Sequence, residues 1–307
     1  MTVAAAVPAL SLESQTDAER RSRRTAILLI CGCYALFACL DTSAKWLGNQ
    51  GLPVLAVVWA RYAGASVMGL AMVKPFATPN GFKSNRLWLQ LARASTLVAS
   101  TLLNFYALRY LQLAETVSIA FAMPLLVALL AGPMLGEWVG PRRLIAIFAG
   151  FLGVLLVVRP GTAGFHPAML LVMAAVVFYA LYGIFTRILA RHDSSNTTLV
   201  YSSLPAALLM TPALPSFWAW PQTGLQWTVL VATGLLASFG HLLLIRAHRH
   251  APAAVLAPFV YGEIIWMVAL GYLVFGDVPG LWTLAGGSIV VASGLYLWYR
   301  ERVVKGA

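Results

Sequence analysis

Apolar residues form ten continuous stretches along the chain, each close to the roughly 20 residues that a helix needs to cross a bilayer. The stretches do not alternate between apolar and polar positions, as strands with one wet face do. Short links of the Gly-Pro and Asn-Gly kind separate them. We therefore predict an all-α integral membrane protein with ten transmembrane helices. Their expected ranges are 25–48, 53–73, 88–110, 114–135, 142–159, 166–190, 196–214, 225–247, 251–275 and 281–299.

The amino-acid composition also indicates a protein embedded in a lipid bilayer. Of the 307 residues, 60% are hydrophobic and 10% are charged, whereas soluble proteins carry about 25% charged residues. The mean hydropathy is +0.81. Cys31, Cys33 and Cys39 lie in one stretch without a distant partner, so we expect neither a disulfide nor a metal site. The sequence has no Walker motif and no His-Glu-x-x-His, so we expect no cofactor, no ATP-driven step and no enzyme activity.

The basic residues predict the orientation in the membrane. The formal net charge is +11, and the Lys and Arg residues collect at the ends of apolar stretches, which indicates topology rather than nucleic-acid binding. With a cytoplasmic N-terminus, sixteen of them fall inside and only Lys45, Arg109 and Arg159 fall near the outside. We predict a multi-pass protein of a bacterial inner membrane with both termini cytoplasmic. Residues 1–24 are expected to form a disordered tail, and residues 301–307 a second tail.

The chain repeats itself weakly at a separation of about 140 residues, which predicts two halves at 25–159 and 166–300. The matching positions are 107–110 with 247–250, Gly136-Glu137 with Gly276-Asp277 and, at a separation of 142, Lys45 with Arg187. Five helices is an odd number, so the second half enters the membrane from the opposite side. Such inverted repeats place a binding site near the midplane where the halves meet. Glu137 and Asp277 are expected to cap or bond nearby backbone, with no transport role.

Short motifs recur in the same order in the two halves. They are Ala107-Leu-Arg-Tyr-Leu111, Ala114-Glu115, Leu135-Gly-Glu137, Gly150 and Gly153, then His250-Ala-Pro-Ala-Ala254, Ala257-Pro-Phe259, Phe275-Gly-Asp277, Gly286, Gly287 and Gly294. In this order they resemble the EamA-type drug/metabolite transporter superfamily over about residues 25–300. Leu40–Lys45, Val58–Tyr62 and Gly240–Arg246 resemble a branch that includes bacterial riboflavin and S-adenosylmethionine importers. Glu263 departs from that branch, where an uncharged polar residue is usual. The resemblance implies the ten-helix inverted-repeat fold and metabolite transport without fixing a substrate.

Ionisable side chains inside the predicted helices are candidate site residues, because burial there costs at least about 2.5–3.5 kcal/mol near the bilayer centre. Glu263 lies mid-stretch, opposite Met123 in the repeat. It is either a site for a substrate cation or a proton, or a buried carboxyl that locks two helices. Arg61 is either a cavity residue or a structural ion pair with Asp41 or Glu263. Asp41 and Lys45 stand four apart on one face, as a gating pair at the outer mouth or a local ion pair.

Uncharged polar and aromatic residues complete the candidate site. His241, opposite Thr101 in the repeat, either relays protons, bonds a ligand or serves packing, and Asn104 is similar. Pro124 and Pro258 each remove a backbone hydrogen bond within a stretch, as hinges for gating or as ordinary kinks. The aromatic residues that are candidates for stacking on a planar ligand are Tyr34, Phe37, Trp59, Phe121, Tyr179, Tyr182, Tyr201, Tyr261 and Trp266.

These features predict a secondary transporter that moves a small, partly polar organic metabolite by alternating access, with proton coupling as one form of the mechanism. The alternatives are a passive facilitator or exchanger, and a membrane-embedded enzyme or assembly subunit without transport. The expected partners are a small-molecule substrate and the lipid bilayer, with no nucleic acid. Glycines in 142–159 and 281–299 permit close packing within the chain or between chains, so the protein is predicted to be a monomer or a homodimer.

Overall fold

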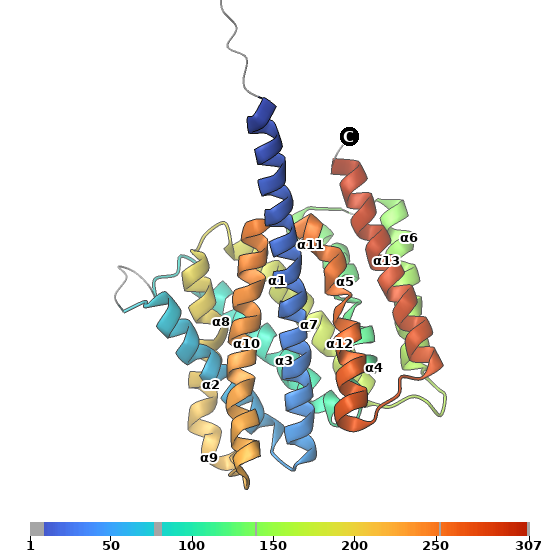
Figure 1. Ribbon diagram of the computed structural model, residues 1–307. Helices are drawn as coiled ribbons and strands as arrows, with labels where there is room; N and C mark the ends of the chain where they lie inside the picture. The colour runs from blue at the N-terminus through green and yellow to red at the C-terminus, as the bar shows by residue number, and fades with distance from the viewer. Residues whose placement is uncertain (1–8, 77–81, 139, 252, 306–307) are drawn as a thin grey trace, which may run out of the picture.

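The computed structural model describes residues 9–76, 82–138, 140–251 and 253–305, and every regular element in these ranges is helical. The start of α1 and the end of α13 lie at the same end of the bundle (Figure 1). The elements are α1 (Ala9–Asn49), α2 (Val54–Val73), α3 (Leu87–Leu108), α4 (Leu113–Ala120), α5 (Met123–Leu135), α6 (Pro141–Val158), α7 (Ala168–Leu189), α8 (Ser195–Met210), η1 (Thr211–Ala213), α9 (Leu214–Phe217), α10 (Gly224–His250), α11 (Ala253–Val260), α12 (Glu263–Leu270), η2 (Gly271–Phe275) and α13 (Leu281–Lys305).

These elements make ten crossings. Within the described ranges, nine spans are long and apolar enough to cross a membrane. Three of the nine are composite: Leu113–Leu135 joins α4 and α5, Asn196–Phe217 joins α8, η1 and α9, and Val255–Phe275 joins α11, α12 and η2. The tenth crossing is α3, whose 22 residues are long enough but include the buried polar side chains Gln90 and Arg93. The predicted all-α membrane fold with ten helices is confirmed.

Helix packing follows the internal repeat. The first crossing, α1, packs on the eighth, α10, and the third, α3, packs on the sixth, α7. When crossings one to five are matched to crossings six to ten, the contact between the first and eighth crossings becomes the contact between the sixth and third crossings. The second crossing packs on the seventh (α2 on α8) and the fifth on the tenth (α6 on α13), so each of these contacts maps onto itself. The halves are therefore related by approximate twofold symmetry, and the odd number of crossings inverts the second half.

The fourth and ninth crossings are both broken in the middle. The second half-helices, α5 and α12, begin at Met123 and Glu263, which are 140 residues apart, and two residues separate each of them from the half-helix before it. Pro124 is the second residue of α5, whereas Pro258 lies inside α11. Discontinuous helices at matching positions are typical of transport proteins, which use the broken backbone to build a site at mid-depth.

The backbones of the fifth and tenth crossings, α6 and α13, lie in direct contact because both helices carry glycine at the contact. A Cβ atom on Gly153 of α6 would lie 2.8 Å from the backbone oxygen of Gly286 of α13, and one on Gly286 would lie 2.5 Å from that of Gly153. Any side chain at either position would force the helices apart. The glycines of the fifth and tenth crossings are thus used within the chain. The oligomeric state stays a prediction.

The N-terminal part of α1 differs from the prediction. We expected a disordered tail over residues 1–24, but the described part of α1 begins at Ala9 and runs without a break into the membrane span Arg20–Asn49. Residues 1–8 lie outside the described residues. Residues 9–24 contain many good helix formers, and extending a helix that already exists avoids the cost of nucleating one.

Asp193, in the link between α7 and α8, ties two links of the bundle together. Its carboxylate accepts hydrogen bonds from the hydroxyl of Ser84, from the backbone N–H of Asn85 at 2.7 Å and from Nε2 of Gln90 at 2.9 Å. Partial burial acts to raise the pKa of Asp193, but these hydrogen bonds outweigh it and hold the pKa below its ordinary value. The α2–α3 link and the α7–α8 link are therefore held together at this end of the bundle.

Replacing Asp193 with asparagine should lower the Tm of the purified protein by about 2 °C at neutral pH. Hydrogen bonds to this partly exposed group contribute about 1 kcal/mol, and 1 kcal/mol shifts Tm by about 2–4 °C at this size. Because the folded pKa is depressed, the contribution is fully present above the unfolded value of about 3.9 and is lost as pH falls through the folded pKa. The difference in Tm between the two proteins should begin to shrink as pH falls below about 4. A constant difference down to about pH 3 would contradict this assignment.

Candidate functional site

Polar side chains from both repeats meet in a cavity of about 210 Å³ inside the bundle. Its wall is formed by α1, α2 and α3, the break between α4 and α5, α7, α10, and the break between α11 and α12. Membrane proteins with inverted repeats bind their ligands at such a place. The polar residues that define the site are Asp41, Arg61, Ser100, Thr101, Asn104, His241 and Glu263.

Among the residues that the structure describes, Arg61 is the single guanidinium on the cavity wall. It is buried, and its Nη1 donates to Oγ1 of Thr101 at 2.7 Å. The Thr101 hydroxyl donates to a backbone carbonyl one turn earlier, so it accepts from both Arg61 and the hydroxyl of Tyr62, 2.9 Å away. Nε of Arg61 has no hydrogen-bond partner among the described residues. The predicted ion pair with Asp41 or Glu263 is not formed, and the guanidinium keeps a donor for a carbonyl or an anionic group.

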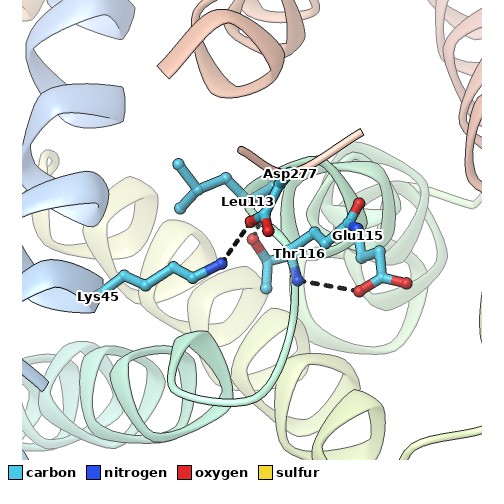
Figure 2. Close-up of polar contacts among 6 residues, drawn as sticks. Lys45, Leu113, Glu115, Thr116 and Asp277 are labelled. Carbon is cyan, nitrogen blue, oxygen red and sulfur yellow. Dashed lines mark hydrogen bonds and ion pairs between the residues drawn. The ribbon is translucent and has the colours of Figure 1, made fainter. Parts of the chain in front are cut away.

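Asp41 and Asn104 form a second polar contact on the wall. Nδ2 of Asn104 donates to Oδ2 of Asp41 at 3.1 Å. Lys45, one helical turn further along α1, instead places Nζ 2.6 Å from Oδ2 of Asp277 (Figure 2). The local ion pair between Asp41 and Lys45, one of the two predicted readings, is therefore not formed, and a gating role stays a prediction. An acid from the other repeat lies within reach of Lys45, while Asp41 points into the cavity.

Glu263 is the first residue of α12, at the break in the ninth crossing, and it lines the cavity. The N-terminal end of a helix carries a partial positive charge, which favours a carboxylate there. Among the described residues its carboxyl has no hydrogen bond or ion pair, so both oxygens remain available to a ligand or a proton. Its repeat counterpart Met123, the first residue of α5, presents an apolar side chain at the matching break.

An aromatic row lies beside these charged groups. Nδ1 of His241 is 2.8 Å from the carbonyl oxygen of Ala237, which can only accept, so Nδ1 carries a proton. In the neutral imidazole, Nε2 is then an acceptor. The imidazole packs edge-on against Phe37 at 5.2 Å between ring centroids, and Phe37 packs edge-on against Tyr34 at 6.2 Å. Tyr34, Phe37 and His241 all line the cavity. The wall thus offers both ring faces and polar groups to one ligand.

Among the other predicted aromatic residues, Phe121 lies on the cavity wall, and so does Tyr179. Tyr179 stacks on Tyr182 at 5.6 Å, and Tyr182 lies under the guanidinium of Arg93, with 5.1 Å to the ring centroid. Tyr261 packs edge-on against Phe121 at 5.0 Å, behind the wall. Tyr182 and Tyr261 therefore support the site from outside it.

Trp59, Trp266 and Pro258 lie away from the cavity. Nε1 of Trp59 donates to Oγ1 of Thr211 at 3.1 Å, and its ring packs against Trp218. Trp266 is 45% exposed on the surface of the bundle, where lipid would meet it. Of the two prolines, Pro124 lines the cavity and Pro258 does not. The gating roles of both prolines stay predictions.

Two site residues escaped the sequence analysis. Ser100 and Thr101 of α3 line the cavity beside Arg61. Thr101 is the repeat counterpart of His241, and this correspondence was the signal that could have identified it. Ser100 carries no such signal, because serine is common in membrane helices.

A ten-helix bundle of inverted repeats with a polar cavity at its centre defines a membrane transporter of the inverted-repeat class. The chain matches the model of the EamA-like transporter family over residues 24–159 and again over residues 166–299. The protein belongs to the EamA-like transporter family. It is thus a multi-pass membrane transporter with a small-molecule substrate, and not an enzyme.

Similar proteins extend over most of the chain. A riboflavin transporter of Vibrio cholerae serotype O1 is 30% identical over 84% of this chain and 87% of its own. An S-adenosylmethionine uptake transporter of Rickettsia prowazekii is 25% identical over 85% of this chain and 88% of its own. A solved crystal structure aligns with 91% of this chain and 95% of its own at a TM-score of 0.59. Its 19% identity makes that likeness one of fold alone.

Proposed function

We propose that the protein is a secondary transporter that moves a small, partly polar organic metabolite across a bacterial inner membrane by alternating access between its repeats. Both termini lie in the cytoplasm, as the distribution of Lys and Arg favours. The observation that carries the proposal is the convergence of polar side chains from both repeats on one cavity, where Arg61 and Glu263 have hydrogen-bonding atoms without a partner among the described residues.

The cavity favours a ligand with a planar ring and a polar or charged part. Tyr34, Phe37 and His241 offer ring contacts, and Arg61 and Glu263 offer groups of opposite charge. The relatives named for riboflavin and for S-adenosylmethionine suggest flavins and adenosyl compounds as the first substrates to test. Glu263 and its neighbours bind the substrate or couple its movement to a proton.

Reconstituted protein tests this function directly. We expect a flavin or an adenosyl compound to raise the Tm in detergent, since a ligand at a hundred times its Kd stabilises the folded state by about 2.7 kcal/mol. The same compound should enter proteoliposomes, and a pH gradient should drive its accumulation if protons are coupled. A passive facilitator or exchanger would only equilibrate or exchange it. A panel of metabolites that neither shifts Tm nor crosses the membrane would contradict the proposal.

A further inference from the structure

Two ion pairs occupy equivalent positions in the two repeats. Nζ of Lys45 lies 2.6 Å from Oδ2 of Asp277, and Nη2 of Arg187 lies 2.6 Å from Oε1 of Glu137. In the sequence Lys45 corresponds to Arg187 and Asp277 corresponds to Glu137. The two basic residues therefore occupy matching positions in the two repeats, and so do the two acidic residues. Because the repeats are inverted, the two pairs lie toward opposite faces of the membrane.

Each acid is held by the same kind of helix end. Gly276 and Gly136 end their helices with φ of +72° and +75°, a conformation that glycine adopts at little cost. The backbone N–H of the next residue then donates a hydrogen bond to a carbonyl of the helix. Asp277 donates to Gly271 at 3.0 Å, and Glu137 donates to Ala131 at 3.1 Å. The main chain thus presents both carboxylates at matched positions.

Each pair joins one repeat to the other. Lys45 belongs to α1 of the first repeat and Asp277 to the link after η2 of the second, while Arg187 belongs to α7 of the second repeat and Glu137 to the link after α5 of the first. Figure 2 shows the Lys45 side chain reaching out from α1 to Asp277, with the first turn of α4 in the same view.

The pairs also lie at the two ends of the cavity. Lys45 is one helical turn beyond Asp41, which lines the cavity on α1. Arg187 is about two turns beyond Tyr179, which lines it on α7. Separating the repeats at one end, as alternating access requires, therefore has to break the pair at that end.

The two pairs differ in their contact with solvent. The side chains of Lys45 and Asp277 are 8% and 23% exposed, and the Lys45 ammonium lies 4.5 Å from the centroid of the Phe275 ring. The side chains of Arg187 and Glu137 are 50% and 47% exposed. The attraction between two charges is stronger where little water surrounds them, and breaking such a pair leaves a poorly hydrated charge at a cost in free energy. Ion pairs exposed to water contribute little to stability.

We propose that these pairs are matched gates of the transport cycle: the Lys45 gate (Lys45 with Asp277) and the Arg187 gate (Arg187 with Glu137). Opening the cavity to one face breaks the gate at that face. The Lys45 gate is the stronger of the two, so without substrate the cavity is closed more firmly at the end of the bundle where Lys45 lies. This inference rests on the proposed alternating-access function and adds Arg187 as a gating residue. It also replaces the expectation that Glu137 and Asp277 have no transport role.

Accessibility of the cavity to a thiol reagent tests the gates without a known substrate. Cys31, Cys33 and Cys39 are replaced with alanine, and Ser100→Cys places a near-isosteric thiol on the cavity wall. Labelling by a membrane-impermeant maleimide is then timed from each face of oriented vesicles. We expect Lys45→Gln to speed labelling from the Lys45 face at least about tenfold. Arg187→Gln should speed it about twofold to threefold from the opposite face.

Two controls keep the result interpretable. Arg109→Gln removes a basic side chain that packs on Gly48 of α1, near Lys45, and should leave both rates unchanged. The double variant Lys45→Asp with Asp277→Lys restores the attraction and should return labelling toward the starting rate. Single variants that label at the starting rate, or a charge swap that labels like the single variants, would overturn the gates while transport still stands. Absence of flux for every metabolite in the panel would instead count against the proposed function.

Discussion

Replacing Glu263 with glutamine lowers substrate flux at least about tenfold and removes the dependence of flux on pH. The carboxyl faces the cavity without a partner among the described residues, so a ligand or a proton is the partner left to it. A hydrogen bond to a charged group contributes about 1.5–3 kcal/mol, and about 1.4 kcal/mol corresponds to tenfold. Glutamine keeps the shape and loses the titratable group. Initial uptake into proteoliposomes, of whichever flavin or adenosyl compound the protein accepts, measures the effect over about pH 5.5–8.

Glu115 offers the matched control for this variant. Its Oε2 accepts a hydrogen bond from the backbone N–H of Gln112 at 3.0 Å, as part of the capping box that starts α4. Glutamine makes the same capping contact. Glu115→Gln should therefore leave flux and its pH response unchanged. If Glu263→Gln behaves like Glu115→Gln, Glu263 is neither a binding group nor a coupling group.

Replacing Arg61 with methionine weakens substrate binding at least about tenfold. The side chain places its guanidinium on the cavity wall with a buried Nε that no described residue satisfies. Methionine keeps most of the apolar stem and removes the charge and the donors. Arg61→Lys should fall between wild type and Arg61→Met, because an ammonium keeps the charge without the planar set of donors. Isothermal titration of the detergent-purified variants gives the Kd values.

Arg93 is the matched control for Arg61, since it is also a buried arginine in a crossing. It is 1% exposed, and its Nη2 donates to the carbonyl of Thr198 at 2.6 Å and to the hydroxyl of Ser202 at 2.8 Å. It does not line the cavity. Arg93→Met should lower Tm and leave the Kd within about twofold of wild type. Equal changes in Kd for Arg61→Met and Arg93→Met would show that Arg61 acts on stability alone.

The repeats share a scaffold but not a set of polar groups. Glu263 corresponds to Met123 at the matched helix breaks, and His241 corresponds to Thr101 on the cavity wall. A symmetric bundle therefore surrounds an asymmetric site. This arrangement suits a substrate whose two ends differ, because each end can find its own partners while the scaffold moves between two related states.

Much of the fold could be predicted because hydropathy is a local property. The expected helix at 53–73 agrees with α2, Val54–Val73, within one residue, since a bilayer imposes a similar length on every crossing. The prolines at positions 124 and 258 signalled irregular helices. The breaks themselves came only from the structure, because Pro124 begins a half-helix while Pro258 is tolerated inside one.

The sequence alone determined the ten crossings, the repeat and the presence of charges at mid-depth, because each follows from residue type and order along one segment. Only the tertiary structure decided which charges meet. Lys45 pairs with Asp277, 232 residues away, and not with Asp41 four residues away, and Arg61 bonds Thr101 rather than an acid. Side-chain partners depend on how each helix is rotated against helices from the other repeat, and that rotation is set by packing across the whole bundle.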